Sequence, residues 1–318
     1  MSAVLPVLVR RILDEGAFCH VASSTRAGPH VTPMVFASAG GRIWVTTSRG
    51  SVKARAWRRD PRVAGLIRSE NRSVAFAGSV RTFDLLDAQS WGRSISESPV
   101  LALAAARFTR KNAKFFAGYA VDAHRVPFAW TPPGRVFAEL RPDRTALVQD
   151  GRLTSTWGAW GDEVSSLDRF RATRTGTDPL HASPPSVRQD VGMGGEGALA
   201  LETGQGPVVV PCAWVVDGAA VYAALQAEVV SIAGAASRVP AALEMDRAAS
   251  WRARSMVGAM IRGQGEVAVR ASLRSGAGSF ERISRSAGVD PSAAALVAIR
   301  ARSLVWWRGW TSGTVDTA

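Results

Sequence analysis

The sequence has few of the residues that form disulfides or bind metals. It contains two cysteines, Cys19 and Cys212, each in an apolar segment, and four scattered histidines in 318 residues. No two histidines have the i, i+4 spacing that places both on one face of a helix. Isolated thiols in apolar segments are typical of reduced, buried cysteines in a cytoplasmic protein. We therefore expect a cytoplasmic protein with no disulfide and no metal site.

Long hydrophobic runs are also missing. No stretch approaches the roughly 18 consecutive apolar residues that a membrane-spanning helix needs. Arg10 and Arg11 follow the first apolar stretch, whereas a secretory signal has its positive charges first. The hydrophobic fraction of 47% and the charged fraction of 20% are those of a folded globular protein. The sequence predicts no interaction with a membrane.

Acidic residues are outnumbered by basic ones, 26 to 39, which gives a formal net charge of +13. Such an excess favours anionic partners, such as nucleic acid, phosphate or the acidic tail of a cofactor. The basic residues do not alternate with aromatic ones as on a nucleic-acid stacking platform, and no helix-turn-helix or zinc-finger pattern is present. We therefore expect a small-molecule ligand and no nucleic-acid partner.

The two halves of the chain repeat each other. Residues 28–46, GPHVTPMVFASAGGRIWVT, align without gaps with residues 206–224, GPVVVPCAWVVDGAAVYAA. Four further blocks follow in the same order, among them GAFCHVASS at 16–24 with GALALETGQ at 197–205. Repetition on this scale indicates a tandem duplication.

The repeated blocks have the composition of β-strands. They are short, rich in Val, Ile and aromatic residues, and separated by glycine turns such as 39–41 and 217–218. Short strands at this spacing predict a barrel or a sandwich in each half. Helical patterns are present near 3–15, 51–60 and 86–118. The expected fold class is therefore mainly β with helices, of the α+β type.

The domain organisation follows from the repeat. We expect a first domain over residues 1–153 with a helical insertion at 84–135, and a second domain over 187–318. Between them, residues 154–186 are rich in Gly, Ser, Thr and Pro and are predicted to form a linker. Two such domains can satisfy each other's interface, which predicts a monomeric pseudo-dimer. A homodimer of such chains is the alternative.

One stretch of the first half has a pattern suited to binding an anion. In TTSRGSVKARAWRRDPRV, residues 46–63, a strand ends in hydroxyl side chains, Gly50 permits a tight turn, and Ser51 can cap a helix that stops before Pro61. The free N–H groups and the dipole at such a helix start favour a phosphate. The candidate ligands, from hydroxyl and basic side chains, are Thr46, Thr47, Ser48, Arg49, Ser51 and Lys53. The alternative is a solvated basic face, which is our interpretation of Arg58 and Arg59.

The second half serves as an internal control for this interpretation. The positions equivalent to the candidate ligands Thr46, Thr47, Ser48, Arg49 and Lys53 hold Ala224, Leu225, Gln226, Ala227 and Ser231. The glycine, proline and apolar residues that build the strands are kept, while the basic cluster is lost. We infer one phosphate site per chain, in the first half.

At these residues the first half resembles the pyridoxamine 5'-phosphate oxidase-like family of flavin and deazaflavin reductases. The likeness rests on a strand that ends in Thr and Ser, then Lys53, then the run RRDPRV at 58–63. It extends over about residues 5–150, and the second half resembles the same barrel with its motif lost. The resemblance implies two tandem FMN-binding split β-barrels that form a pseudo-dimer.

The resemblance also implies roles for individual residues. The hydroxyl and basic cluster would hold the cofactor phosphate in the groove between the barrels. His30 and Thr32, on the neighbouring strand, could flank the ring system or be ordinary barrel residues. Trp307 and Arg308, in VWWRGW, could form the opposing wall, or the tryptophans could pack the second core.

Two features depart from the family's pattern. The Asn or Asp-Leu pair expected after the Lys-x-Arg motif is replaced by Ala56 and Trp57. The insertion carries Arg107, Arg110, Lys111 and Lys114 at helical spacing, which predicts one basic face. This face could be solvated, hold an acidic tail, or cover the pocket.

The expected function is that of an oxidoreductase that uses FMN or coenzyme F-420 for hydride transfer to a small organic substrate. Hydride chemistry belongs to the cofactor, and the sequence assigns no catalytic side chain. FMN and F-420 are not separated by the sequence, because both carry a phosphate. The alternative is a non-catalytic flavin or haem carrier of the same fold, with His30 or His124 as a haem ligand.

Overall fold

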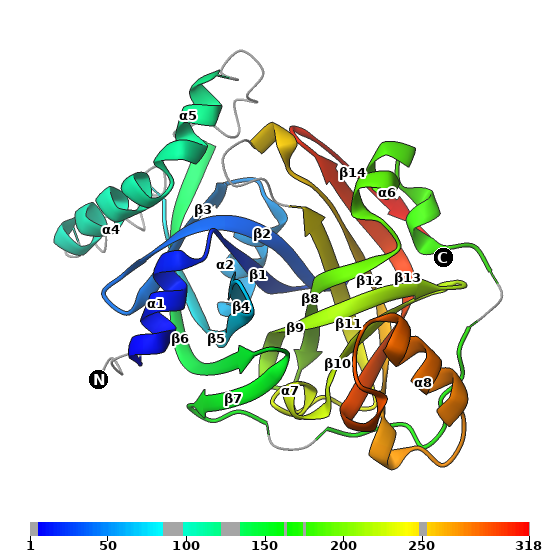
Figure 1. Cartoon of the computed structure of the whole chain (residues 1–318). Helices are drawn as coiled ribbons and strands as arrows, with labels where there is room; N and C mark the ends of the chain where they lie inside the picture. Colours follow the sequence, from blue (N-terminus) through cyan, green and yellow to red (C-terminus); the bar gives the residue numbers. More distant parts are fainter. Residues whose placement is uncertain are drawn as a thin grey trace.

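The structure is a computed structural model that describes residues 6–84, 98–121, 134–161, 164–173, 176–247 and 253–317. Over these residues the chain forms two antiparallel β-barrels with helices at their edges (Figure 1). Each barrel has six strands closed into a ring and a seventh strand paired to the last. The expectation of a mainly β fold built from two tandem barrels is confirmed.

The first barrel has the strand order β3-β2-β1-β4-β5-β6, and a β3–β6 pairing closes it. A seventh strand, β7, continues the sheet beside β6. The strands are β1 (Phe18–Thr25), β2 (Gly28–Ala39), β3 (Arg42–Ser48), β4 (Arg62–Ser69), β5 (Arg72–Phe83), β6 (Arg135–Gln149) and β7 (Arg152–Trp157).

The helices of the first half lie around this barrel. Helix α1 (Val7–Glu15) buries its apolar side in the barrel core, and α2 (Val52–Arg59) connects β3 to β4. Helices α4 (Ser98–Lys111) and α5 (Ala113–Val121) lie between β5 and β6 and extend outward from the barrel (Figure 1).

The second barrel repeats this order as β10-β9-β8-β11-β12-β13, closed by a β10–β13 pairing and followed by β14. The strands are β8 (Gly194–Thr203), β9 (Gly206–Asp217), β10 (Ala220–Gln226), β11 (Arg238–Arg247), β12 (Val257–Val269), β13 (Ala294–Arg308) and β14 (Thr311–Asp316). The helices are α6 (Pro185–Val191), α7 (Ala227–Ser231) and α8 (Ala277–Ser286), with short 3-10 turns η4 (Pro179–Ala182), η5 (Ala253–Ser255), η6 (Arg270–Ser272) and η7 (Pro291–Ala293).

The strand register corrects one part of the repeat alignment. Thr25 pairs with Gly28 in the first hairpin, and Thr203 pairs with Gly206 in the second. Counting back along β1 and β8 from these hairpins matches His20 with Ala198. The alignment of GAFCHVASS with GALALETGQ is therefore wrong by three residues. The strands upstream of the two hairpin turns align without a gap.

A shared irregularity confirms that the two barrels follow one plan. The β5–β6 register shifts between Ala77 and Gly78, and the β12–β13 register shifts between Arg262 and Gly263. A Cβ atom on Gly78 or on Gly263 would collide with a carbonyl oxygen of the next strand. Both bulges therefore require glycine, because the neighbouring backbone approaches too closely for a side chain.

The barrels pack directly against each other. Strands β4 and β5 lie against β9, and β2 lies against β8, β11 and β12. The largest buried cluster contains Val31 and Leu66 of the first barrel together with Val209, Leu243 and Met260 of the second. The two barrels thus share an apolar core at their interface. No helix among the described residues is long and apolar enough to cross a membrane.

Candidate functional site

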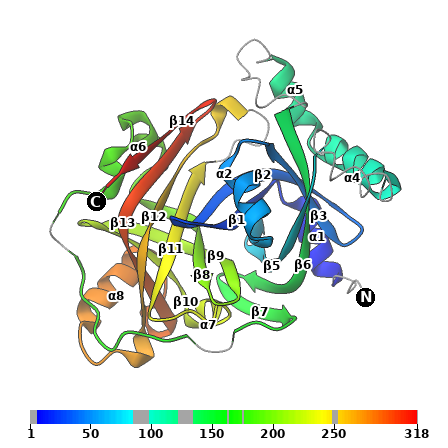
Figure 2. The ribbon, with the colours of Figure 1, turned by 180° about the vertical axis from the view of Figure 1, so that it is seen from behind.

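The turn between β3 and α2 has the geometry that the sequence predicts. Strand β3 ends at Ser48, and Ser51 caps α2, its Oγ accepting a hydrogen bond from the Ala54 N–H at 3.0 Å. Thr47 Oγ1 donates to Ser51 Oγ, also at 3.0 Å. In Figure 2 the helix lies beside the strands of the first barrel. Gly50 has no left-handed φ and an added Cβ would meet no atom within 4 Å, so the turn itself does not require glycine.

Thr46 and Arg49 are held by residues outside the turn. Thr46 Oγ1 donates to the Val136 carbonyl at 3.1 Å and accepts from Arg135 Nε at 3.1 Å, which ties it to β6. Arg49 forms an ion pair with Asp84. Both residues therefore support the turn, and Arg49 has its charge compensated within the protein.

Lys53 is buried next to β2. Its side chain extends from the first turn of α2, the residue is 4% exposed, and Nζ donates a hydrogen bond to Thr32 Oγ1. Among the described residues, no carboxylate lies within ion-pair distance of this ammonium group. Burial lowers the pKa of Lys53 to about 7, although the charges of Glu244 and Cys19 act in the opposite direction.

His30 lies on the same face of β2 as Thr32, because the two residues are two positions apart on one strand. It is 9% exposed, and its Nδ1 has no hydrogen-bond partner within the described ranges. Burial, and then the positive charges of Lys53 and Arg262, hold its pKa well below the usual value. The ring is therefore neutral. We call His30, Thr32, Thr47, Ser51 and Lys53 the Lys53 cradle.

Trp307 and Arg308, predicted for the wall that the second barrel contributes, make contacts within the second half of the chain. Arg308 forms an ion pair with Asp190 of α6 and also donates to the Ser186 carbonyl at 3.0 Å. Trp307 lies opposite Gly258, where its ring occupies the space of a missing Cβ. Their role in the opposing wall stays a prediction.

Strand β12 is one of the strands of the second barrel that contact β2. The Val31 N–H donates to Met260 Sδ at 3.2 Å, and the charge of Arg262 acts on His30. Sequence reasoning missed both residues because a methionine and an arginine in a strand carry no motif. The sequence repeat aligns β12 with β5, but this alignment does not show which side chains of β12 contact the first barrel.

The equivalent turn of the second barrel has lost these features. Helix α7 has five residues and no side-chain cap, and Leu225 and Ala224 before it are buried apolar residues. Ser231, at the position of Lys53, donates to the Glu228 carbonyl at 2.8 Å. The asymmetry that the sequence predicts is therefore present in the folded chain.

The sequence pattern of the pyridoxamine 5'-phosphate oxidase family matches residues 8–103. Over these residues, less than a third of the chain, the first half is similar to the pyridoxamine 5'-phosphate oxidase family. The match begins in α1, includes every residue of the Lys53 cradle, and ends in α4. No curated protein sequence matches the chain.

Several solved structures are similar to about half of the chain. One is a pyridoxamine 5'-phosphate oxidase-related, FMN-binding protein from Nostoc punctiforme, at 15% identity and a TM-score of 0.34, covering 47% of this chain and 86% of that one. An F-420 reductase has 18% identity and a TM-score of 0.30, covering 44% and 98%. An FAD-binding protein from Mesorhizobium loti has 15% identity and a TM-score of 0.31, covering 48% and 96%.

One departure from the family's pattern has a structural reason. Trp57 is 4% exposed, and its Nε1 donates to Ser23 Oγ at 2.8 Å. Ser23 pairs with His30 across β1 and β2. The bulky indole thus fixes α2 on the strand that neighbours the Lys53 cradle.

The other departure, the insertion, corrects the expectation of one basic face. Lys111 turns toward the barrel, where Nζ donates to the Leu13 carbonyl at 2.6 Å and lies 3.6 Å from the centre of the Phe36 ring. Burial lowers its pKa to about 8. Arg110 and Lys114 are exposed. Helical spacing grouped Lys111 with the other basic residues because it could not show which side of α4 meets the barrel.

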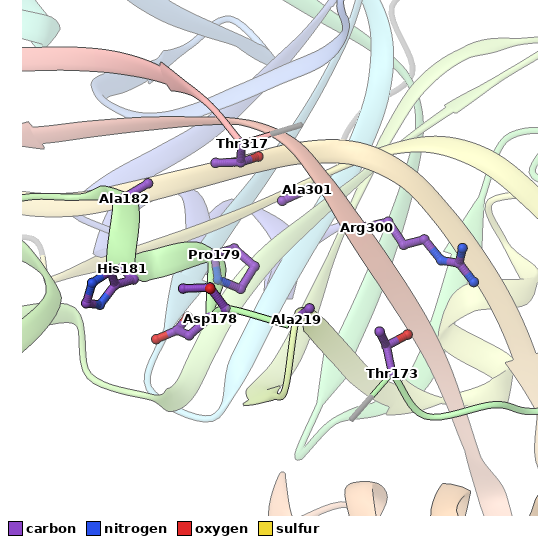
Figure 3. A pocket seen from close by; sticks show the side chains of 10 residues that line it. Thr173, Asp178, Pro179, His181, Ala182, Ala219, Arg300, Ala301 and Thr317 are labelled. Atoms are coloured by element: carbon purple, nitrogen blue, oxygen red, sulfur yellow. The ribbon is translucent and has the colours of Figure 1, made fainter. Parts of the chain in front are cut away.

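A separate open pocket of about 620 Å³ lies on the second barrel. Figure 3 shows Asp178, His181, Arg300 and Thr317 around it, with Thr173 at one side. Its lining comes from the chain before α6, from the β9–β10 turn at Ala219, from β13 and from Thr317 after β14, and no residue of the Lys53 cradle contributes. It is therefore distinct from the family's motif.

Proposed function

We propose that the protein is an oxidoreductase that binds one FMN or F-420 molecule in the first barrel and transfers hydride between its ring and a small organic substrate. The observation that carries this proposal is Lys53. Within the described ranges its buried ammonium group contacts a threonine hydroxyl and no carboxylate. A buried charge without a counter-ion is costly, and a phosphate at this position would supply the missing negative charge.

The surroundings of Lys53 are suited to an anion. The first N–H groups of α2 have no acceptors within the helix, and the positive end of its dipole lies at the same turn. Ser51 and Thr47 add hydroxyl groups next to this terminus. The equivalent turn of the second barrel has neither a lysine nor a capping side chain, which supports one site per chain.

A bound flavin or deazaflavin would supply the hydride chemistry, and the chain would bind and orient it. Lys53 would hold the phosphate charge. The neutral ring of His30 would offer Nδ1 as a hydrogen-bonding atom next to the ring system. Met260 and the other apolar residues of the barrel interface would exclude water from one side. No side chain is assigned to proton transfer.

The decisive experiment is a titration of the purified full chain with FMN and with F-420 in separate samples. We expect one ring per chain, measured by the visible spectrum and by quenching of cofactor fluorescence. Lys53→Ala should weaken binding by roughly tenfold or more, because a charge-assisted hydrogen bond contributes about 1.5–3 kcal/mol. Ser231→Ala, at the equivalent position, is the matched control and should bind as the wild type does.

Two results would contradict the proposal. If neither cofactor binds, the redox function fails. If Lys53→Ala and Ser231→Ala weaken binding equally, the claim of one site per chain fails.

Reduction of the bound ring by NADPH or reduced F-420, followed by reoxidation by an acceptor, separates an enzyme from a carrier. A haem carrier would instead give a Soret band, and His124, one of its expected ligands, lies outside the described residues.

A further inference from the structure

A second cluster of polar side chains lies buried where the two barrels meet. His20 comes from β1 of the first barrel, and Glu244 and Asp246 come from β11 of the second. His20 Nδ1 lies 2.7 Å from Glu244 Oε2. One nitrogen or oxygen from each of the three side chains lies within 4.8 Å of the others. Residues 224 positions apart in the chain thus form one compact group of donor atoms.

This cluster has atoms that lack partners. Glu244 is 0% exposed and His20 is 6% exposed. Over the part of the chain that the structure describes, Glu244 Oε1 and Asp246 Oδ2 are buried without a donor from another residue type, and the two carboxyl groups lie close enough to share a proton. Unsatisfied buried carboxylate oxygens are costly, so a native protein normally provides them with a ligand.

We propose that His20, Glu244 and Asp246 bind one divalent transition-metal ion between the two barrels. One imidazole nitrogen and two carboxylates are a ligand set suited to Zn²⁺, Co²⁺, Mn²⁺ or Fe²⁺. The ion takes the position of the proton between His20 and Glu244, and protons are released to solvent as it binds. Because the ligands come from both barrels, the ion joins the two halves of the chain.

The pseudo-symmetry of the chain shows that the fold does not require this cluster. His20 pairs with Leu66 across β1 and β4, and the equivalent pair across β8 and β11 is Ala198 with Glu244. By the same register, Arg68 matches Asp246. The other half of the interface therefore has Ala198, Leu66 and Arg68 at the three positions, which cannot bind a cation. Among the described residues this donor set therefore occurs once.

Two positive side chains lie close enough to influence the choice of ion. Arg68 and Lys53 both act electrostatically on His20 and Glu244, and Arg68 donates to the Gly197 carbonyl. Their charges oppose cation binding. Mg²⁺ and Ca²⁺ rely on oxygen ligands and charge alone, whereas transition metals also gain from the imidazole bond. We therefore expect selectivity for transition metals over Mg²⁺ and Ca²⁺.

The test uses the full chain, freed of any affinity tag and stripped with EDTA. Zn²⁺ is titrated against a chromophoric chelator, and Co²⁺ is added separately to record its visible ligand-field bands. We expect one ion per chain and a higher melting temperature in the presence of Zn²⁺. The near-isosteric Glu244→Gln and Asp246→Asn should abolish stoichiometric binding. The controls Glu202→Gln, a carboxylate on β8 bonded to Ser24, and His181→Ala, an exposed histidine, should keep it.

The outcomes are separable. A wild type that binds no stoichiometric Zn²⁺ or Co²⁺ overturns the proposal, and the cluster is then a hydrogen-bonded contact that shares protons. Binding that survives in both Glu244→Gln and Asp246→Asn overturns it as well, because the ion must then lie elsewhere. The Co²⁺ spectrum of the wild type needs no variant, so misfolding of a variant does not affect it. No cofactor is added, so the result is independent of the proposed redox function.

Discussion

At the scale of single residues, Lys53 shows how burial converts an ordinary lysine into a candidate ligand-binding group. The side chain gives up its hydration and keeps one hydrogen bond, to Thr32. Such a charge is costly to the empty protein and useful only when an anion is bound. Thus the residue that is best placed to bind a phosphate should also be one that destabilises the protein without it.

We predict that Lys53→Met stabilises the cofactor-free chain, and more at pH 6 than at pH 9. The folded-state pKa of Lys53 is lowered to about 7 from 10.5, so the unfolded chain binds the extra proton between these values. The cost of the charge is therefore greatest below pH 7 and is progressively relieved as the pH rises. The gain in the free energy of unfolding is at most about 5 kcal/mol at pH 6.

Thermal melts of the wild type and of Lys53→Met, recorded with EDTA at the same pH values, measure the difference in stability between the two proteins. The groups that act on Lys53 or are acted on by it are Cys19, His20, His30 and Glu244. Burial also raises the pKa of Glu244 to about 8, so the variant is compared with the wild type at each pH. An advantage for Lys53→Met that stays constant from pH 6 to pH 9 would show that Lys53 does not titrate in this range.

At the scale of elements, the bulges at Gly78 and Gly263 determine how each barrel closes. Each bulge inserts one residue into a long strand and increases its bend, so that a sheet of few strands can close into a ring. The extra residue of the first bulge, Asp143, lies on β6 opposite Ala77 and Gly78, and β6 pairs with β3, the strand that leads into the Lys53 cradle. Closure of the barrel and placement of the cradle therefore depend on each other.

Gly78→Ala should destabilise the chain by roughly 1–3 kcal/mol or more, because the added Cβ would collide with the Arg141 carbonyl oxygen and displace β6. Gly50→Ala is the matched control, since its Cβ would meet no atom within 4 Å and its φ is not left-handed. Chemical denaturation of both variants measures the difference. Equal stability of Gly78→Ala and Gly50→Ala would mean that the bulge relaxes without cost.

At the scale of the whole molecule, the two barrels share a single core. Val31 and Leu66 pack with Val209 and Leu243, so neither half can be removed without exposing apolar surface of the other. The tandem arrangement provides within one chain the interface that two separate barrels would have to form by association. One barrel could then lose its anion-binding residues while it kept its role as a packing partner.

We predict that the chain is a monomer and unfolds in one cooperative transition. Sedimentation measures the mass, and calorimetry compared with tryptophan fluorescence measures the cooperativity, since tryptophans are present in both barrels. Trp44 and Trp57 report on the first barrel, and Trp214 and Trp307 on the second. Two separated transitions would show that the shared core does not couple the halves.

The sequence by itself determined the features that depend on local chemistry. Alternating apolar residues and glycine turns specify the strands, and the turn from hydroxyls through Ser51 to Lys53 specifies a capped helix start. The repeat specified two barrels, and the substitution of Lys53 by Ser231 in the second copy marked its turn as degenerate. These signals span a few residues each, so they can be read without knowledge of the fold.

Only the tertiary structure decided which side chains meet. The burial of Lys53 against Thr32 and the turn of Lys111 toward the barrel depend on how α2 and α4 pack. The contact of His20 with Glu244 joins the two barrels, and the pairing of Arg308 with Asp190 holds that arginine to α6. Such contacts depend on how distant elements pack, which the sequence pattern of each element does not specify.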